Sequence, residues 1–253
     1  MRVFAVSDLH IDYEVNAKWV RGLSSVDYVN DVLILAGDIT DKRHLLEWCL
    51  TTLSKLFKRV LFVPGNHELW VVREGSSKDS MKKFYEVVAT VESSGASMHA
   101  FCESEVSIMP LLGWYDYSFG EPSEDLRSTW MDYRTCRWPS GLTEKDIVAY
   151  FTAFNNRQTW NTAETVITYS HFLPRIDLMP SFVPRATRLL YPILGSDQLE
   201  FQLRTFTPKI HVYGHSHLNC QTTIDGVSYI NNAFGYPSET RITSKRLKCI
   251  HES

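Results

Sequence analysis

The sequence has few cysteines and places none of them close together. Five occur among 253 residues, and there is no CxxC motif. An odd number at wide spacing argues against a disulfide framework and favours a reducing compartment. The first apolar run, residues 3–6, is too short for a signal peptide or a membrane span. We therefore expect a cytoplasmic protein that does not associate with membranes.

The chain also lacks a surplus of positive charge. It has 26 Lys and Arg residues against 29 Asp and Glu residues, which gives a formal net charge of -3. Proteins that bind long nucleic acids usually carry a marked basic excess, so such a partner is not expected. Hydrophobic residues make up 44% of the chain, enough for a full core. Without internal repeats or a clear linker, residues 1–253 are expected to form a single domain.

One pattern recurs five times along the chain. A short apolar run ends in one or two small residues, and an acid, an asparagine or a histidine follows. The apolar runs cover residues 3–6, 32–36, 60–63, 166–169 and 210–213. Their continuous rather than alternating hydrophobicity predicts strands that are buried on both faces.

The segments between these runs have the spacing of amphipathic helices. We expect four helices: over 43–58, over 78–93, after a cap at Thr143 and after a cap at Ser196. A hairpin is expected within 220–233, turning at Asp225-Gly226, and a final strand at 241–250. Alternating strands and helices predict a layered α/β fold, whose ligand site lies beyond the carboxyl ends of the strands.

The polar residues at these strand ends are typical metal ligands. They are Asp8, His10, Asp38, Asn66, His171, His215 and His217. Carboxylate, imidazole and amide oxygen suit divalent Mn, Fe or Zn. One closed tetrahedral site needs only four ligands, so two ions that share a carboxylate use this set better. Each residue alone could be a helix cap, a turn residue or a surface histidine, but all of these explanations would have to hold together.

The five segments resemble the motifs of the calcineurin-like metallophosphoesterase family, in the family's order. The matching segments are Asp8-Leu9-His10, Gly37-Asp38-Ile39-Thr40-Asp41, Gly65-Asn66-His67-Glu68, the single His171, and Gly214-His215-Ser216-His217. The resemblance extends over residues 3–217. It implies a sandwich of two mixed β-sheets flanked by helices.

The resemblance also implies roles for the individual residues. Asp38 would bridge two ions; the first would also take Asp8, His10 and His217, and the second would take Asn66, His171 and His215. His67 would face the substrate as a general acid, and Asp41 would orient it. Two divalent ions lower the pKa of water and neutralise charge on a phosphoryl group. The expected activity is therefore metal-dependent hydrolysis of a phosphate monoester or diester.

Several alternatives stay open at this stage. Asp41 could be an ordinary acid at a helix start, and Glu68 fits a structural role near the site better than ligation. A non-catalytic scaffold on the same fold is the rival function, although the complete ligand set and His67 disfavour it. The substrate is expected to be a small molecule or a nucleotide. The sequence does not decide the oligomeric state.

Residues 114–160 interrupt the rhythm of strands and helices. This segment is rich in aromatic residues and arginines, and we expect it to be an insertion near the site. Its part from 114 to 140 could form a lid beside the metals, or its aromatic residues could pack a local core. Together with Asn66 and His67, Arg134 is a candidate for substrate binding.

Overall fold

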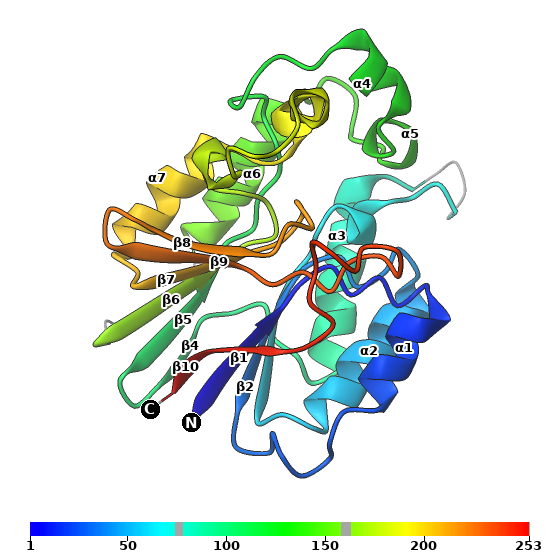
Figure 1. Ribbon diagram of the computed structural model, residues 1–253. Helices are drawn as coiled ribbons and strands as arrows, with labels where there is room; N and C mark the ends of the chain where they lie inside the picture. Colours follow the sequence, from blue (N-terminus) through cyan, green and yellow to red (C-terminus); the bar gives the residue numbers. More distant parts are fainter. Residues whose placement is uncertain (74–77, 158–162, 253) are drawn as a thin grey trace.

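The fold is built on two β-sheets whose strands carry the apolar runs. The computed structural model describes residues 1–73, 78–157 and 163–252 (Figure 1). One sheet has four strands in the order β10 (Lys248–Glu252), β1 (Arg2–Val6), β2 (Val32–Ala36) and β3 (Arg59–Val63). The other has six, in the order β4 (Phe101–Glu103), β5 (Val106–Pro110), β6 (Thr165–Tyr169), β7 (Ile210–Tyr213), β9 (Val227–Asn231) and β8 (Cys220–Ile224). Both sheets mix parallel and antiparallel pairs, which confirms the expected sandwich.

Helices cover the outer faces of the two sheets (Figure 1). Beside the four-stranded sheet lie α1 (Glu14–Arg21), α2 (Arg43–Ser54) and α3 (Ser80–Ser93). Beside the six-stranded sheet lie α6 (Glu144–Asn155) and α7 (Asp197–Thr205). The short helices α4 (Glu124–Thr129) and α5 (Asp132–Thr135) stand apart at one end, and short 3-10 turns occupy His67–Leu69, Ile176–Leu178 and Arg185–Ile193.

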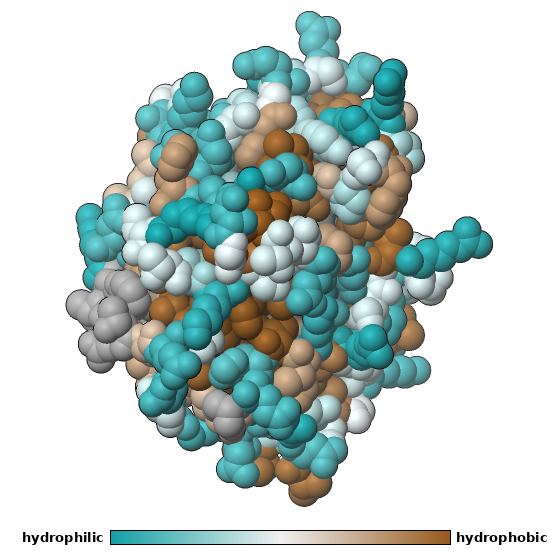
Figure 2. All heavy atoms as spheres, turned by 60° about the vertical axis from the view of Figure 1, so that its left-hand side comes forward, coloured by the Kyte–Doolittle hydropathy of each residue, from teal (hydrophilic) through white to brown (hydrophobic). Residues whose placement is uncertain are grey.

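The two sheets share one apolar core. Every residue of β2 is buried, as continuous apolar runs predict for strands covered on both sides. On the face drawn in Figure 2, hydrophilic side chains predominate, and apolar ones are visible between them. None of the helices in the described ranges is long and apolar enough to cross a membrane.

The local signals for helix starts and for the hairpin are confirmed. Thr143 forms a capping box with Asp146 at the start of α6. The Ser196 side chain accepts a hydrogen bond from the Gln198 N–H at the start of α7. Strands β8 and β9 pair antiparallel around Asp225-Gly226, where both residues have positive φ angles.

Two predicted boundaries were wrong, and the helices α1, α4 and α5 were not expected. Helix α2 ends at Ser54 rather than at 58. The final strand begins at Lys248, because Lys245 donates to the carbonyls of Gly235 and Tyr236, at 3.0 and 2.9 Å, and holds the preceding residues in a loop. Helix α1 was missed, although its buried Asn16 links the Leu9 carbonyl to the Gly235 carbonyl. Residues 158–160, at the end of the expected insertion, lie outside the described residues.

Candidate metal centre

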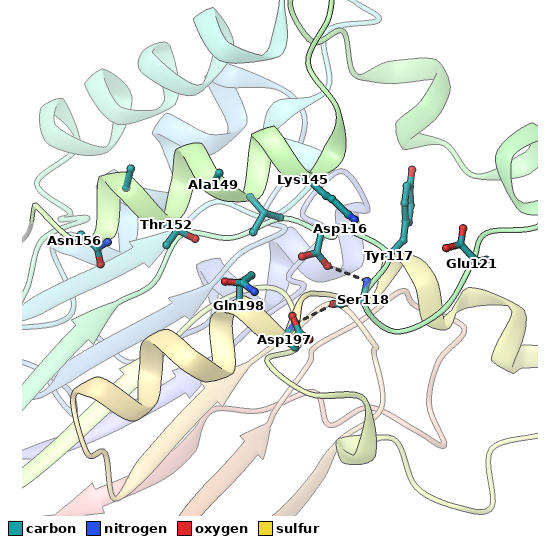
Figure 3. Close-up of a pocket in the computed structure, with 12 residues that line it drawn as sticks. Asp116, Tyr117, Ser118, Glu121, Lys145, Ala149, Thr152, Asn156, Asp197 and Gln198 are labelled. Atoms are coloured by element: carbon teal, nitrogen blue, oxygen red, sulfur yellow. Dashed lines mark hydrogen bonds between the residues drawn. The ribbon is translucent and has the colours of Figure 1, made fainter.

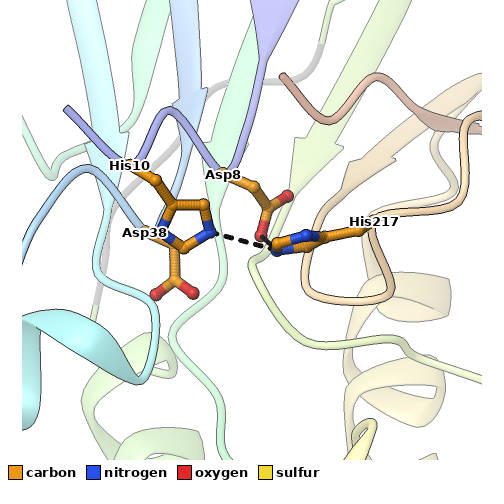
Figure 4. A group of neighbouring side chains, drawn as sticks. All are labelled: Asp8, His10, Asp38 and His217. Carbon is orange, nitrogen blue, oxygen red and sulfur yellow. Dashed lines mark hydrogen bonds and ion pairs between the residues drawn. The ribbon is translucent and has the colours of Figure 1, made fainter. Parts of the chain in front are cut away.

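The polar residues that follow five strands of both sheets meet at one place. Asp8 and His10 follow β1, Asp38 follows β2 and Asn66 follows β3, whereas the three remaining histidines follow β6 and β7. Six of these seven residues are at least 91% buried. Figure 4 shows four of them, His10, Asp8, Asp38 and His217, gathered from separate segments of the chain. The structure thus brings together all seven metal-ligand candidates.

The backbone is forced into an uncommon conformation at this site. Five candidates have left-handed φ angles: Asp8 at 54°, His10 at 42°, Asp38 at 56°, His215 at 65° and His217 at 51°. This conformation costs an L-residue about 1–2 kcal/mol. Such outliers cluster at functional sites, where the surrounding fold maintains them. The sharp turns aim successive side chains into one space.

Glycines let two of these turns approach each other. A Cβ on Gly37 would lie 2.4 Å from His171 Nδ1, and one on Gly65 would lie 2.1 Å from Asp38 Oδ1. Both distances are below any real Cβ contact. The glycines before Asp38 and Asn66 are therefore required by the close packing of the candidate ligands.

The donor atoms form two groups that share Asp38. One group contains Asp8, His10, Asp38 and His217, and the other contains Asp38, His171 and His215, with the donor atoms of each group within 4.8 Å of one another. In the first group, His217 Nε2 lies 3.2 Å from Asp8 Oδ1 and 3.1 Å from His10 Nε2. The grouping is the one that the family resemblance implies.

The second group also includes the amide of Asn66. The Nε2 atom of His171 lies 3.2 Å from Asn66 Oδ1 and 3.2 Å from His215 Nδ1. The same nitrogen is 3.6 Å from Asp38 Oδ2. Carboxylate, imidazole and amide oxygen atoms therefore converge on the space between these side chains.

Three histidines have their second ring nitrogen fixed by an acceptor. His171 Nδ1 is 2.8 Å from the Ala36 carbonyl, and His215 Nε2 is 3.0 Å from the Ile193 carbonyl. His217 Nδ1 is 2.7 Å from Glu239 Oε2. Donation of N–H to these acceptors leaves the lone pair of the other nitrogen facing the site. This arrangement is characteristic of metal-binding histidines, so the residues fit a pair of divalent ions.

Burial and neighbouring charges shift the pKa values of several groups at the site. Burial, together with Glu68 and Asp8, raises the pKa of Asp38 well above its usual value. Burial opposes the charged form of His217, but Asp8 and Glu239 outweigh it and raise the pKa to about 10. Burial keeps the pKa values of His10 and His215 well below the usual value, so both rings are neutral and able to ligate.

Glu68 supports the site through the backbone. Its carboxylate accepts hydrogen bonds from the N–H groups of Asp38, Ile39, Thr40 and Gly65, at 2.7–3.1 Å. Burial raises its pKa to about 7, although these donors favour the charged form. The expected structural role of Glu68 is confirmed, because it ties together the loops after β2 and β3.

His67 lies at the edge of the two groups. Its ring stacks on Trp70 with the centroids 3.8 Å apart, and its Nε2 is 3.7 Å from Asp38 Oδ2. Burial and the neighbouring His171 and His217 lower its pKa to about 3. The side chain therefore faces the ligand groups as a neutral imidazole in the absence of substrate.

The structure does not place Asp41 against His67. The Oδ2 atom of Asp41 lies 2.8 Å from Arg73 Nε, and no hydrogen bond or ion pair within the described ranges joins Asp41 to His67. The expected orienting contact is therefore absent. Asp41 immediately precedes the N-cap of α2, so the start of that helix fixes its position. His67 belongs to a different segment, the turn after β3.

The segment after β5 reaches the site through α5. Asp132 Oδ1 accepts a 2.9 Å hydrogen bond from Asn66 Nδ2, and the Trp130 ring lies edge-on to His215 with centroids 6.1 Å apart. In contrast, Trp114 and Tyr115 are buried in the core. One part of the segment thus borders the candidate ligands, and another part packs in the core. Arg134, a substrate-binding candidate, donates to the Ser128 carbonyl within the same segment.

A separate groove of about 860 Å³ lies between α6, α7 and the loop after β5 (Figure 3). Lys145 and Thr152 approach it from α6, Gln198 from α7 and Ser118 from the loop. None of the seven metal-ligand candidates lines it. The groove is therefore distinct from the metal centre.

The fold and this ligand arrangement define a metal-dependent phosphoric ester hydrolase. The family model for calcineurin-like phosphoesterases matches residues 1–219, and the chain belongs to that family. It is 28% identical to [acyl-carrier-protein] phosphodiesterase PptH of Mycobacterium tuberculosis, over 94% of this chain and 79% of that protein. The crystal structure of phosphopantetheinyl hydrolase PptH from the same organism is similar, with a TM-score of 0.78 and 23% identity, covering 98% of this chain and 95% of that one.

Several neighbours of the ligands carried no signal in the sequence. Asp132 and Glu239 lie far along the chain from Asn66 and His217, and Trp70 looked like one aromatic residue among many. The carbonyl acceptors of Ala36 and Ile193 have no side-chain signature at all. Only the three-dimensional fold identifies these partners.

Proposed function

We propose that the chain is a phosphodiesterase whose two divalent ions are held by seven side chains. Asp8, His10, Asp38 and His217 hold one ion, and Asp38, Asn66, His171 and His215 hold the other. The observation that carries the proposal is the sharing of Asp38 by two groups of donor atoms. Mn, Fe and Zn all suit this mixture of carboxylate, imidazole and amide ligands.

When bound, such a pair of ions activates water and neutralises charge on the phosphoryl group. The side chains of the protein supply the rest of the reaction. His67, on the rim of the centre, donates a hydrogen bond and then a proton to the leaving oxygen. Its pKa of about 3 in the free protein means that the negative charge of a bound phosphate has to favour the imidazolium, since Asp41 makes no contact with it. Trp70 keeps the imidazole in place by stacking.

We favour a diester over a monoester as the substrate. Among the described residues, no lysine or arginine makes a hydrogen bond or an ion pair with any of the seven candidate ligands. A dianionic monoester is commonly held by such basic groups. A diester carries one negative charge and needs less compensation. The relative whose match covers 94% of this chain is also named a phosphodiesterase.

We further propose that the diester joins a phosphopantetheinyl group to an acyl carrier protein. The support is the name of the 28% identical relative, together with a structural match that covers 98% of this chain. A match of that extent has to include most of the segment that contacts Asn66. The expectation of a free small-molecule or nucleotide ester is the competing proposal, and the aromatic rings of Trp70 and Trp130 beside the site suit a flat group.

One experiment separates these substrates. The purified protein with Mn²⁺ is incubated with phosphopantetheinylated acyl carrier protein, and intact-mass spectrometry follows loss of the group. Nucleotide diesters and aryl phosphodiesters are assayed in parallel, with Asp38→Ala as the inactive control. Release from the carrier protein faster than from any free ester supports the proposal. Hydrolysis of free esters alone contradicts the carrier-protein assignment but leaves the phosphodiesterase assignment intact.

The chemistry of the cysteines supports a cytoplasmic location, which we also propose. All five cysteines are free thiols, and Cys49 is fully buried. Free thiols persist in a reducing compartment. Recovery of the protein in an oxidising compartment, with disulfide-linked cysteines, would contradict this.

A further inference from the structure

Asp132 is a buried carboxylate whose two oxygens are both engaged. It is 2% exposed and lies on α5, in the segment after β5. Its Oδ1 accepts hydrogen bonds from Asn66 Nδ2 at 2.9 Å and from Trp70 Nε1 at 2.7 Å. Its Oδ2 accepts from Trp130 Nε1 at 2.8 Å. Three donors from different places in the chain thus converge on one side chain.

The bond to Asn66 determines which end of the amide faces the candidate metal site. An amide has one oxygen that can ligate a cation and one NH₂ group that cannot. With its Nδ2 held by Asp132, Asn66 presents Oδ1 toward His171 Nε2, at 3.2 Å. Without that acceptor the amide could turn over and present hydrogens to the cation. Asp132 therefore selects the ligating orientation.

The hydrogen bonds from Trp70 and Trp130 connect Asp132 to two histidines at the site. Trp70 stacks on His67, with centroids 3.8 Å apart and an interplanar angle of 27°. Trp130 lies edge-on to His215, at 6.1 Å and 88°. Because both indole N–H groups donate to Asp132, the rings that border these histidines are held by the same carboxylate. A displaced Asp132 would loosen all three contacts together.

We propose that Asp132 is a positioning residue that aligns Asn66 for the second metal ion and Trp70 beneath His67. This inference rests on the proposed dinuclear function. It links the segment after β5 to assembly of the metal centre. The effect on the two ions is unequal, since Asp132 touches a ligand of the second ion and no ligand that belongs only to the first. Partners of this kind typically contribute about 10–100-fold to metal affinity.

The test is a calorimetric Mn²⁺ titration of metal-free wild type and Asp132→Asn. The substitution keeps the shape of the side chain but removes its charge and one acceptor oxygen. Asp125→Asn is the matched control, because Asp125 is exposed on α4 of the same segment. We expect two ions per wild-type or control chain. In Asp132→Asn, the ion at Asn66 should lose about 10–100-fold in affinity, while the other changes less than about threefold.

A second readout separates positioning from general stability. Excess Mn²⁺ should restore most of the turnover of Asp132→Asn, since refilling the site compensates for a misaligned ligand. Equal affinities in wild type and variant, or parallel weakening of both ions, would overturn the proposal. If the variant does not fold, a crystal structure of the Mn²⁺-loaded wild type decides: an Asn66 amide turned away from Asp132 would overturn it as well. Fewer than two ions in the wild type would instead contradict the proposed dinuclear function.

Discussion

The two halves of the candidate metal centre are held by different parts of the chain. In the first half, the ring of His217 is fixed by the carboxylate of Glu239, in the loop before β10. In the second half, the rings of His171 and His215 are fixed by backbone carbonyls, and Asn66 is fixed by Asp132. The comparison teaches that identical imidazole ligands can be oriented by a charged side chain or by neutral backbone.

This difference also appears in the charges of the rings. Although burial opposes it, the carboxylates of Asp8 and Glu239 raise the pKa of His217 to about 10. Burial lowers the pKa of His171, and that of His215 lies well below the usual value. The first half thus combines a charge-paired His217 with a neutral His10, whereas both rings of the second half are buried and neutral. The carboxylate of Asp38 belongs to both halves.

The largest effect is expected from Asp38→Ala, which removes the ligand common to both halves. Two ions supply several kcal/mol of transition-state stabilisation, so turnover should fall about 10⁴-fold or more. Metal analysis after dialysis should show loss of both ions. Retention of one ion at full affinity would show that the two halves bind their ions independently, and it would contradict the shared role of Asp38.

The next effect is expected from His67→Ala, which leaves both halves in place. Loss of a general acid typically lowers turnover about 10²–10⁴-fold. An alkyl ester should suffer most, because an activated aryl leaving group needs no proton. Rates for both classes of ester, measured with the Mn²⁺ content verified, check this. Equal losses for the two classes would contradict the role of His67 as a proton donor.

A smaller effect is expected from Glu239→Gln, the counterpart of Asp132→Asn for the first half. Removing the charged acceptor of His217 should weaken the first ion about 10–100-fold and leave the second nearly unchanged. Mn²⁺ titration of the metal-free variant measures both affinities. If the second ion weakened equally, the halves would not be held separately as we describe.

The smallest effect is expected from Asp41→Asn, which touches neither half. The substitution breaks the pair with Arg73; Asp41 is buried, but the Arg73 side chain is 65% exposed, so solvent screens the pair and it is worth about 0–1 kcal/mol. Turnover on an alkyl ester should therefore change no more than about fivefold. A loss as large as that of His67→Ala would show that Asp41 orients His67 during the reaction after all.

The seven ligand candidates of both halves could be predicted from the sequence. Asp8 and His10 follow a continuous apolar strand, and His217 sits in a short motif, so local patterns locate all three. The parallel strands β1 and β2 bring Asp8, His10 and Asp38 to one edge of the four-stranded sheet, whereas His217 comes from the six-stranded sheet. The predicted strand boundaries lie close to the observed ones, because burial on both faces leaves a strong hydrophobic signal.

The supports of both halves, Glu239 and Asp132, could not be predicted in the same way. Asp132 reaches Asn66 across 66 positions, and its short helix follows an irregular segment without a periodic pattern. Asp41 shows the opposite failure, since its motif position suggested a contact that the fold does not make. Such contacts depend on how a loop docks on the finished core, and local propensity carries no information about that.

The most direct test of the shared centre is a crystal structure of the wild-type protein grown with Mn²⁺, using anomalous diffraction to locate the ions. The account predicts two peaks about 3.5–4 Å apart, the usual separation in two-metal sites. Asp38 should contact both peaks, with His217 on one side and His171 on the other. A single fully occupied peak, or two ions that do not share Asp38, would contradict it.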